Sequence, residues 1–313
     1  MPSSEQREFA ASLRELLAKA DVPSLSRSGE WRPLWTQLAD VGVCALGTPV
    51  THGGFGADAV DLVIGFEELG RAAVPGPWIE SVAALPALLA GTSAADQLPL
   101  LASGAVVASL AAPPDVPFAV AGADVDELYL LQGGTLRAAT AGAHRSSVDR
   151  SRRLVEAIPG AVLAEGVDAA RAADLGALAA AAQALGAGEA LLDRATAYAQ
   201  QRQQFGRAIG SFQAVKHQLA DVLVGLQFAR PLLFGAALAV RDLAVTQRRD
   251  VSAAKVACTE AAYRAARVAL QVHGAIGYTA EYDLSLWLTS VRALVPAWGT
   301  PRVHRDRVLG ALQ

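Results

Sequence analysis

The chain has 313 residues, of which 52% are hydrophobic and 18% charged, and its net charge is −3. This length exceeds what one average core serves, so we expect two or three domains, and the apolar content excludes a disordered protein. The small net charge excludes the electrostatic footprint of a nucleic-acid-binding protein, although a single local cation suffices for a nucleotide ligand.

Residues 1–104 carry helical patterns and predict an all-α N-terminal domain. The first segment, MPSSEQREFAASLRELLAKA, is an amphipathic helix of mixed charge, without the basic start and apolar run of a signal peptide. The later segment AVDLVIGFEELGRAAVP predicts a helix that ends near Gly70. Glu67 and Glu68 are neighbours on that helix and point in different directions, so a solvated helix end is favoured over an acid pair.

The helical spacing of apolar residues ends at about residue 105, and residues 105–167 predict a small β domain. Short apolar runs are separated there by Pro and Gly: AVVASLA, PFAVAG, ELYLLQG, TLRAATA and GAVLAEG. Residues 168–313 return to helical patterns and predict an antiparallel bundle, so the expected fold class is mainly α. The bundle helices are expected over 170–202, 212–245, 250–273 and from about 283 onward.

Two further features concern the compartment. The longest apolar stretch, LGALAAAAQALGAGEALL, is mostly alanine and carries Gln183 and Glu189, so it predicts a core helix and not a membrane span. Cys44 and Cys258 are too few for a disulfide framework or a zinc ligand set, and we expect two buried reduced thiols. Together these features predict a cytoplasmic protein that uses neither a metal nor a membrane.

The segment YAQQRQQFGRAIGSFQAVKHQLADV forms a corner between two predicted helices. Gly206 suits the residue that follows the first helix, and Ser211 suits the N-cap of the second. One interpretation is a solvated corner with an exposed Arg202. The other is an anion site, because an arginine fork fits a phosphate or diphosphate, Phe205 offers a flat apolar surface, and the following helix start offers free N–H groups.

A second segment, QVHGAIGYTAEYDLSLWL, ends a long helix in a loop of small residues that would let a ligand approach the backbone. Its GxxG pattern alone is a weak phosphate signal. Gln271 suits either a donor to a phosphate or a cap of the turn, and His273 suits either a ligand or a capping or packing residue. In the C-terminal tail, His304, Arg305, Asp306 and Arg307 predict surface ion pairing, because no G-x-S-x-G is present to support a Ser-His-Asp site.

Three segments together resemble the acyl-CoA dehydrogenases: RQQFGRAIGSFQAVKHQLADV, QVHGAIGYTAEYDLSLWL and HGGFGADAVDLVIGFEELGRA. The resemblance covers residues 1–104 and about 170–313. The resemblance implies an all-α N-terminal domain, a β middle domain and a C-terminal four-helix bundle. It also implies FAD, an acyl-CoA thioester and an oligomer, typically a tetramer. In this family a carboxylate removes the α-proton and the β-hydride passes to the flavin.

The resemblance also assigns cofactor-binding residues. Arg202 resembles the arginine that meets the FAD diphosphate of a neighbouring subunit. Three residues resemble those lining the adenine side: Phe205, Ile209 and Phe212. Three others resemble the segment that holds the diphosphate from the bundle: Gln271, Gly274 and Ala275.

Two departures from the family concern the chemistry. The middle domain is short and contains no tryptophan, so the half-site for the flavin ring is not visible. The glutamate that acts as the base in this family usually precedes a Gly-Thr pair, and this chain has Trp298 at that position. In other members the glutamate lies on an early bundle helix, at a position that corresponds to about Gly176 here. We therefore assign no catalytic residue. The nearest acids are Asp174, Glu189, Glu281 and Asp283, each favoured in a structural role, Asp283 as a helix N-cap.

The same pattern is similar to the shorter chain of heterotetrameric α2β2 acyl-CoA dehydrogenases of bacterial steroid degradation. That resemblance implies a partner subunit that keeps the base and the flavin pocket, acyl-CoA substrates that include steroid-derived ones, and an acceptor of the electron-transfer flavoprotein type. Two alternatives stay open: a self-sufficient homo-oligomeric dehydrogenase with a relocated acid, and a flavin-free scaffold subunit. The presence of Arg202, Phe205 and Gln271 argues against the scaffold.

Overall fold

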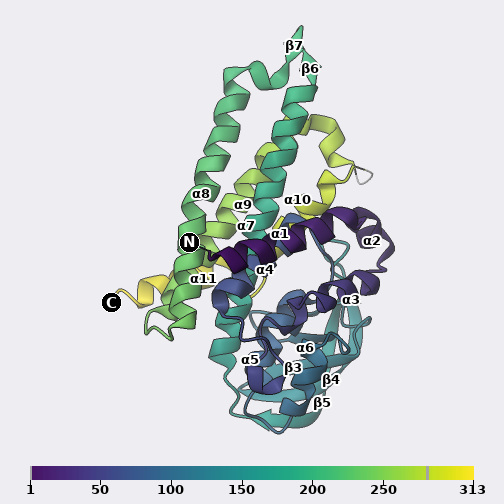
Figure 1. Ribbon diagram of the computed structural model, residues 1–313, viewed down its shortest axis with the longest axis vertical. Helices are drawn as coiled ribbons and strands as arrows, with labels where there is room; N and C mark the ends of the chain where they lie inside the picture. Colours follow the sequence, from purple (N-terminus) through teal and green to yellow (C-terminus); the bar gives the residue numbers. More distant parts are fainter. Residues whose placement is uncertain (1, 280–281) are drawn as a thin grey trace.

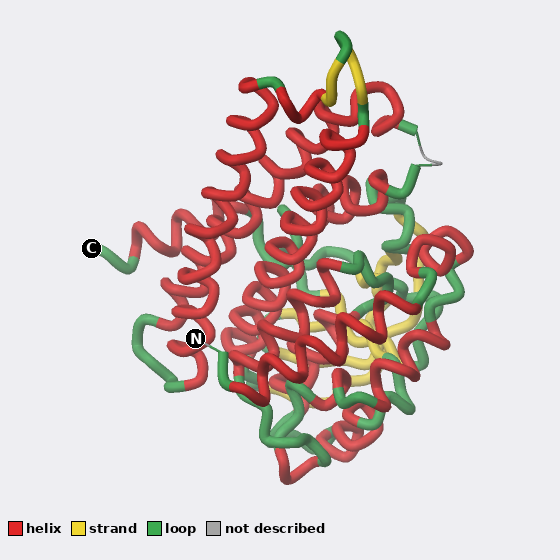
Figure 2. The backbone as a smooth tube through the Cα atoms, turned by 45° about the horizontal axis from the view of Figure 1, so that its top comes forward, coloured by secondary structure: helices red, strands yellow, loops and turns green. Residues whose placement is uncertain are grey.

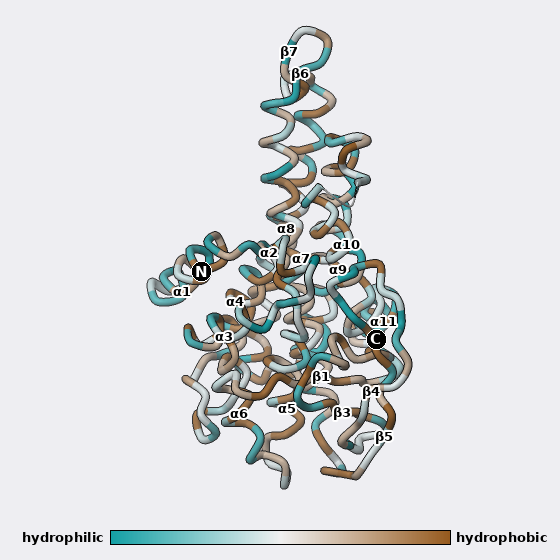
Figure 3. Tube along the Cα trace, turned by 90° about the vertical axis from the view of Figure 1, so that its right-hand side faces the viewer, coloured by the Kyte–Doolittle hydropathy of each residue, from teal (hydrophilic) through white to brown (hydrophobic). Residues whose placement is uncertain are grey.

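The computed structural model describes residues 2–279 and 282–313 and confirms a mainly helical chain with a small sheet. The long helices α7 (Ala169–Gln201), α8 (Gln213–Arg241) and α9 (Gln247–His273) lie side by side as a bundle (Figure 1). Their far end extends from the molecule as a narrow column with the hairpin β6 (Gln203–Gln204) and β7 (Arg207–Ala208) at its tip (Figure 3). We call this part the distal end of the bundle.

The N-terminal helices cover the opposite half of the bundle, which we call the inner half. They are α1 (Ser4–Lys19), α2 (Val22–Ser28), α3 (Arg32–Asp40), α4 (Ala59–Arg71), α5 (Leu85–Leu89) and α6 (Leu98–Ala102), with a π-helical turn at Ile79–Ala84. A capping box starts α1, because the Ser3 hydroxyl accepts from Gln6 N–H and the Gln6 side chain accepts from Ser3 N–H. A second box at Asp58 and Asp61 starts α4 in the same way.

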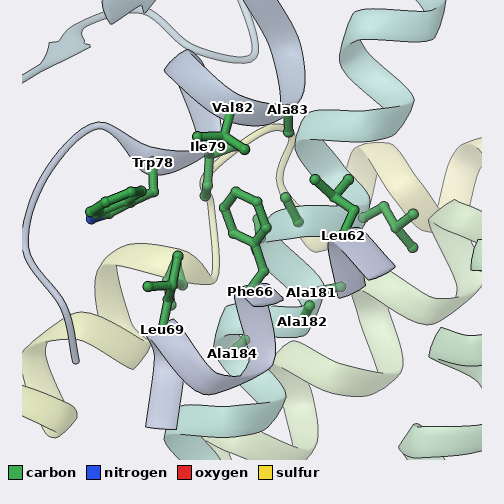
Figure 4. Close-up of a cluster of buried hydrophobic side chains, with 14 of the residues drawn as sticks. Leu62, Phe66, Leu69, Trp78, Ile79, Val82, Ala83, Ala181, Ala182 and Ala184 are labelled. Carbon is green, nitrogen blue, oxygen red and sulfur yellow. The ribbon is translucent and has the colours of Figure 1, made fainter. Parts of the chain in front are cut away.

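The core of the inner half lies where α4 crosses α7. A Cβ added to Gly186 would lie 1.9 Å from the Glu67 carbonyl oxygen, and one added to Gly70 would lie 2.0 Å from that of Gln183. The two backbones therefore touch, which only small residues allow. In Figure 4, Phe66 and Leu69 of α4 lie among Trp78, Ile79 and Val82, beside alanines of α7. The alanine-rich stretch of α7 is thus a core helix, as the sequence predicted, with 89% of its most apolar window buried.

Within the described residues, the apolar runs of the middle region form one sheet, which lies apart from the hairpin, among the helices (Figure 2). Its strands are β1 (Ala108–Ala111), β2 (Ala119–Val120), β3 (Glu127–Gln132), β4 (Thr135–Arg145) and β5 (Leu154–Glu165), in the order β1-β3-β4-β5-β2. Only the β1–β3 pair is parallel. β4 and β5 extend beyond the apolar runs, because backbone pairing holds their polar, exposed residues.

The chain after α9 passes through a turn at Gly274–Tyr278 into α10 (Leu284–Leu294) and α11 (Pro301–Gly310). Cys44 and Cys258 are buried free thiols, as predicted, and burial raises the pKa of each to about 12. Like α7, α8 is long and apolar enough to span a membrane by length and composition, but only 39% of its most apolar window is buried. An apolar helix surface is therefore left uncovered by the described part of the chain.

The predicted corner is a hairpin, and both of its predicted caps are wrong. α7 ends at Gln201 with Arg202 as its C-cap, and Phe212 holds the N-cap position of α8. Phe205 and Gly206 have φ of +53° and +78° and form the tip between β6 and β7, which is the geometry of a tight two-residue turn. The Ser211 hydroxyl donates to the Ala208 carbonyl and caps no helix.

The prediction that Glu67 and Glu68 mark a solvated helix end is also wrong. They are only 6% and 3% exposed, because α4 lies beneath α1, α7 and α8. Arg230 of α8 donates to both Glu67 oxygens at 3.1 and 2.6 Å, and also to Glu189 of α7. Arg14 of α1 donates to Glu68 at 2.9 Å. A buried ionic cluster therefore joins four helices.

Candidate functional site

Arg202 lies at the base of the hairpin at the distal end of the bundle. Its backbone N–H donates to the Tyr198 carbonyl and its own carbonyl accepts from Ile209 N–H, both at 2.8 Å. The side chain is exposed, and its guanidinium forms no hydrogen bond or ion pair with any residue that the structure describes. The backbone is thus held while the charged fork is free to meet an anion from outside this chain.

Phe205 stands at the tip of the hairpin with 90% of its surface exposed. Its ring meets the Phe212 ring edge-on at 6.1 Å, and the Arg207 guanidinium lies 4.0 Å above the Phe212 ring. A φ of +53° is costly for an aromatic residue, and Asn or Gly would suit this turn better. An exposed aromatic side chain in a strained backbone conformation indicates a contact outside the chain. Ile209, the first residue after β7, is half-buried.

Gln271 and Gly274 line a cleft of about 740 Å³ at the end of α9. Arg264 and Arg267 line the same cleft, and Arg267 lies one helical turn before Gln271. Arg264 pairs with Asp221 at 3.0 Å, whereas Arg267 forms no ion pair within residues 2–279 and 282–313. The motif comparison missed Arg267, although its spacing of four from Gln271 places both on one helix face.

The turn after α9 exposes its backbone. Gly274 has a φ of +64°, and a Cβ added there would meet nothing within 4 Å, so the backbone conformation and not crowding requires glycine. Ala275 follows as an exposed residue. The predicted cofactor segment therefore presents an open backbone beside the cleft.

An aromatic stack brings the two predicted segments to the same end of the bundle. The Tyr198 ring, one turn before Arg202, lies 4.2 Å from the ring of His273, which follows Gln271 by two residues. His273 is buried, its Nδ1 bonds the Ala269 carbonyl at 2.8 Å, and burial lowers its pKa. Of the two roles that the sequence left open, His273 therefore has the packing role.

Trp298 and Gly176, the two positions where the resemblance places the missing carboxylate, meet in the inner half. A Cβ added to Gly176 on α7 would lie 2.3 Å from the Trp298 ring. Trp298 is 4% exposed, with a φ of +57°, and Gly299 follows at +103°. The indole thus fills the space between two distant parts of the chain, and it fits only because residue 176 has no side chain.

His304 fixes the backbone of Trp298. It is fully buried, its Nε2 donates to the Trp298 carbonyl at 3.0 Å, and its Nδ1 lies 3.1 Å from the Ser252 hydroxyl. Burial lowers its pKa to about 4, so the ring is neutral near pH 7. The predicted surface role of His304 is wrong, because α11 packs on α9. Its neighbours Arg305 and Arg307 do form ion pairs, with Glu260 and Asp115.

Lys255 holds the chain just before Trp298. It is 1% exposed, and its Nζ donates to the carbonyls of Leu294 and Val295 at 2.8 and 3.1 Å. Burial lowers its pKa to about 7. The carbonyls at the end of α10 are thus satisfied from α9, which fixes the path toward Trp298.

Glu80 is a carboxylate at this site that the sequence comparison missed. It lies in the π-helical turn, is 2% exposed, and its Oε1 accepts from the Trp298 Nε1–H at 3.1 Å. Burial raises its pKa, against the lowering effect of the Arg152 charge. A single acid inside the apolar run PWIESVAALPALLAG was the available signal.

Comparison with known proteins agrees with this arrangement. Residues 3–105 match the acyl-CoA dehydrogenase N-terminal domain, and residues 165–313 match the acyl-CoA dehydrogenase C-terminal domain. The acyl-CoA dehydrogenase IpdE2 of Mycolicibacterium smegmatis is 33% identical over 308 residues, which cover 96% of each chain. The chain belongs to the acyl-CoA dehydrogenase family.

Two solved structures show how complete the acyl-CoA dehydrogenase fold is. The ChsE4-ChsE5 complex from Mycobacterium tuberculosis contains a chain that superposes with a TM-score of 0.84 at 22% identity, covering 100% of this chain and 98% of that one. The Tcur3481-Tcur3483 steroid ACAD gives 0.85 at 22% identity, covering 99% of both. The shared fold spans the whole chain, including the sheet that lies between the two matched domains.

The acids considered above as relocated bases have other surroundings. Glu189 belongs to the ionic cluster of Arg230, and Asp283 stands at the N-cap of α10, but its side chain pairs with Arg27 at 2.7 Å and caps no backbone group. Asp174 is 5% exposed, and burial raises its pKa. A cleft of about 490 Å³ opens beside Trp298 and is lined by Glu80 and Arg152 among others, and none of these three acids lines it. Glu281 lies outside the described residues.

Proposed function

We propose that this chain is a subunit of an FAD-dependent acyl-CoA dehydrogenase that contacts FAD across a subunit interface and leaves proton abstraction to a partner chain. The observation that carries this proposal is the packing of the Trp298 ring against Gly176. An indole N–H donates hydrogen bonds and has no basic lone pair, and glycine has no side chain. Neither position can therefore remove the α-proton of a thioester.

The distal end of the bundle suits the FAD diphosphate. Arg202 and Arg267 form no ion pair within the described residues, and Gln271 and the open backbone at Gly274 lie beside Arg267. Guanidinium forks and backbone N–H groups are suitable donors for a diphosphate, and Phe205 with Phe212 offers flat apolar surface to an adenine. FAD, when bound, supplies the acceptor for the β-hydride. The residues of this chain bind and orient its diphosphate end.

The uncovered face of α8 supports a partner subunit. Val224, Phe228 and Leu232 recur every fourth residue and are 52%, 74% and 47% exposed. Side chains at this spacing share one face of a helix, and an apolar face of this kind is typical of a protein interface. We infer an α2β2 assembly with a second acyl-CoA dehydrogenase chain, in the cytoplasm, with an acceptor of the electron-transfer flavoprotein type.

The substrate class in this proposal is an acyl-CoA thioester, with steroid-derived thioesters included. The resemblance to the shorter chain of the steroid-degrading heterotetramers supports this class. The fold shared with a two-chain steroid enzyme agrees with it.

A self-sufficient dehydrogenase is the second candidate, and one observation favours it. Glu80 places a carboxylate in contact with Trp298, in the region where the family keeps its base. The same experiment separates this candidate from the leading one.

The test is to purify the chain alone and after co-expression with a catalytic acyl-CoA dehydrogenase subunit from the same organism. Flavin absorbance and acyl-CoA oxidation are measured on both samples. We expect a colourless, inactive chain alone and a yellow, active complex that loses flavin in Arg202→Ala. Arg302→Ala is the matched control, because that arginine is 91% exposed on α11. A yellow and active chain on its own would favour the self-sufficient enzyme, and a complex without flavin would favour the scaffold.

A further inference from the structure

A cleft of about 280 Å³ lies where the end of α1 and the start of α2 meet α4, α7 and α10. It shares no lining residue with the cleft beside Trp298 or with the cleft at Gln271. One wall is apolar and consists of Leu17, Ala18, Ala20, Val22, Pro23 and Ala72. The cleft is therefore a separate site, and one of its walls suits an apolar group.

The opposite wall carries most of the charge: Arg14, Glu68, Arg71 and Arg194. Glu68 is 3% exposed and accepts from Arg14 Nε at 2.9 Å and from Arg14 Nη2. Arg71 donates to Glu189, and its Nη1 lies 3.5 Å from Asp193. Arg14 and Arg71 thus engage these acids, and the wall offers no further acid to Arg194.

An aromatic ring holds Arg194 beside the cleft. The guanidinium carbon lies 3.6 Å from the centre of the Trp287 ring, a distance that places it over the face of the indole. Trp287 is 3% exposed, and its Nε1–H donates to the Arg71 carbonyl at 2.8 Å, so the ring is fixed. The N–H groups at the edge of the Arg194 guanidinium form no hydrogen bond or ion pair within residues 2–279 and 282–313. A charged fork therefore stands in a fixed place with its donors unused.

The surroundings of Arg194 favour an anion on the side that faces α1. Burial lowers the pKa of Arg194, and the charge of Asp283 opposes this only in part. Arg194 also lines a neighbouring cleft of about 390 Å³, where an anion would meet the Asp283 carboxylate. On the α1 side an anion meets Arg14 instead, whose Nη1 donates to no residue that the structure describes. Two positive charges thus act on an anion there.

We propose that this cleft binds a small carboxylic acid, with its carboxylate on Arg194 and Arg14 and its apolar body against α1 and α2. Carboxylate oxygens match the planar fork of a guanidinium, and such charge-assisted hydrogen bonds are about twice as strong as neutral ones. An engineered cavity of about 150 Å³ holds benzene, so about 280 Å³ holds roughly ten non-hydrogen atoms. The site needs neither FAD nor a partner chain, so it stands independently of the proposed function.

The test is a calorimetric titration of the full chain without flavin, with 3-phenylpropanoate, 3-phenylpropan-1-ol and 3-phenylpropylamine as probes. The three probes share one apolar body and differ in the charge of the head group. We expect the carboxylate to bind about tenfold more tightly than the alcohol, the effect of one hydrogen bond to a charged group. The amine, which is protonated at pH 7, should bind least because it meets two arginines.

Two variants locate the ligand. Arg194→Leu should remove the preference for the carboxylate, and Arg171→Leu is its matched control on the same helix, outside the cleft. Ala18→Leu fills the apolar side from an exposed position of α1 and should weaken the carboxylate and the alcohol together. Ala11→Leu is its control, because Ala11 is exposed on α1 and does not line the cleft.

Equal affinity for the carboxylate and the alcohol in the wild-type chain, or no binding of either, would overturn the proposal. A preference that survives Arg194→Leu would overturn the assignment of that arginine. Affinity unchanged by Ala18→Leu would overturn the assignment of the cleft. This last variant keeps the proposal falsifiable if Arg194→Leu fails to fold, since residue 18 lies on the surface.

Discussion

The inner half and the distal end of the bundle use their side chains in opposite ways. In the inner half, Trp298 fills the space over Gly176, and both ring nitrogens of the buried His304 have partners. At the distal end, Arg202 and Phe205 are exposed, and Phe205 holds a strained backbone conformation. Trp298 and His304 of the inner half contact other parts of the same chain, whereas the distal end presents groups that the described chain does not use. Substitutions should therefore separate stability from assembly.

The largest expected effect tests the ionic cluster of the inner half. Arg230→Ala removes both Arg230 hydrogen bonds of the buried Glu67 and leaves Glu189 with Arg71 as its remaining donor. Breaking such a cluster should lower the free energy of unfolding by about 3–5 kcal/mol, measured by urea denaturation. Arg264→Ala is the control, because its pair with Asp221 is exposed and should contribute less than about 1 kcal/mol. Equal effects of the two changes would contradict the cluster's role.

The next effect concerns pH. The pKa of His304 is about 4 in the fold and 6.5 as the ordinary value, so the folded chain favours the neutral ring. Its contribution to stability is complete above pH 6.5 and is lost as the pH falls toward 4, where the unfolded chain already binds the proton. The loss should reach about 3 kcal/mol, and it should be absent in His304→Gln. A ring that titrates near 6.5 in an NMR experiment on the folded chain would refute this.

A smaller effect is expected at the contact below Trp298. Gly176→Ala places a Cβ 2.3 Å from the indole and should lower stability by about 1–3 kcal/mol, because a well-packed region must shift. Gly235→Ala is the matched control on α8, since a Cβ there meets nothing within 4 Å. That change should raise stability by up to about 1 kcal/mol through helix propensity. Thermal unfolding of both variants measures the difference, and a stabilised Gly176→Ala chain would argue against the tight contact.

The difference between local patterns and long-range contacts explains how much of the structure could be predicted from the sequence. Helical and alternating periodicities predicted the helices and the strands of the sheet, because these depend on neighbours along the chain. The burial of Glu67 depends on Arg230, 163 residues away, and the contact of Glu80 with Trp298 spans 218 residues. No local pattern contains such pairs, so the ionic cluster and the Glu80 cleft were missed. The distal residues were assigned from motifs alone, and their contact with FAD stays a prediction.

The smallest expected effect on stability comes from a substitution at the tip of the hairpin. This substitution should best distinguish a role in stability from a role in FAD binding. Phe205→Asn puts a residue that favours this turn at a φ of +53° and removes an exposed aromatic ring. The isolated chain should gain about 0.5–1 kcal/mol, because the strain of a non-glycine residue in the left-handed region is relieved. The complex with the partner should bind FAD more weakly, as followed by flavin fluorescence during dialysis.

Gln204→Asn, on the adjacent exposed position of the hairpin, is the control and should change neither property. A Phe205→Asn chain that is more stable alone and poorer in flavin as a complex would mean that the phenylalanine is kept at the expense of stability, for a contact outside the chain. Unchanged flavin retention would place the adenine contact elsewhere. A loss of stability would show that the edge-on contact with Phe212 outweighs the backbone strain, and the distal end would then resemble the inner half more than its exposure suggests.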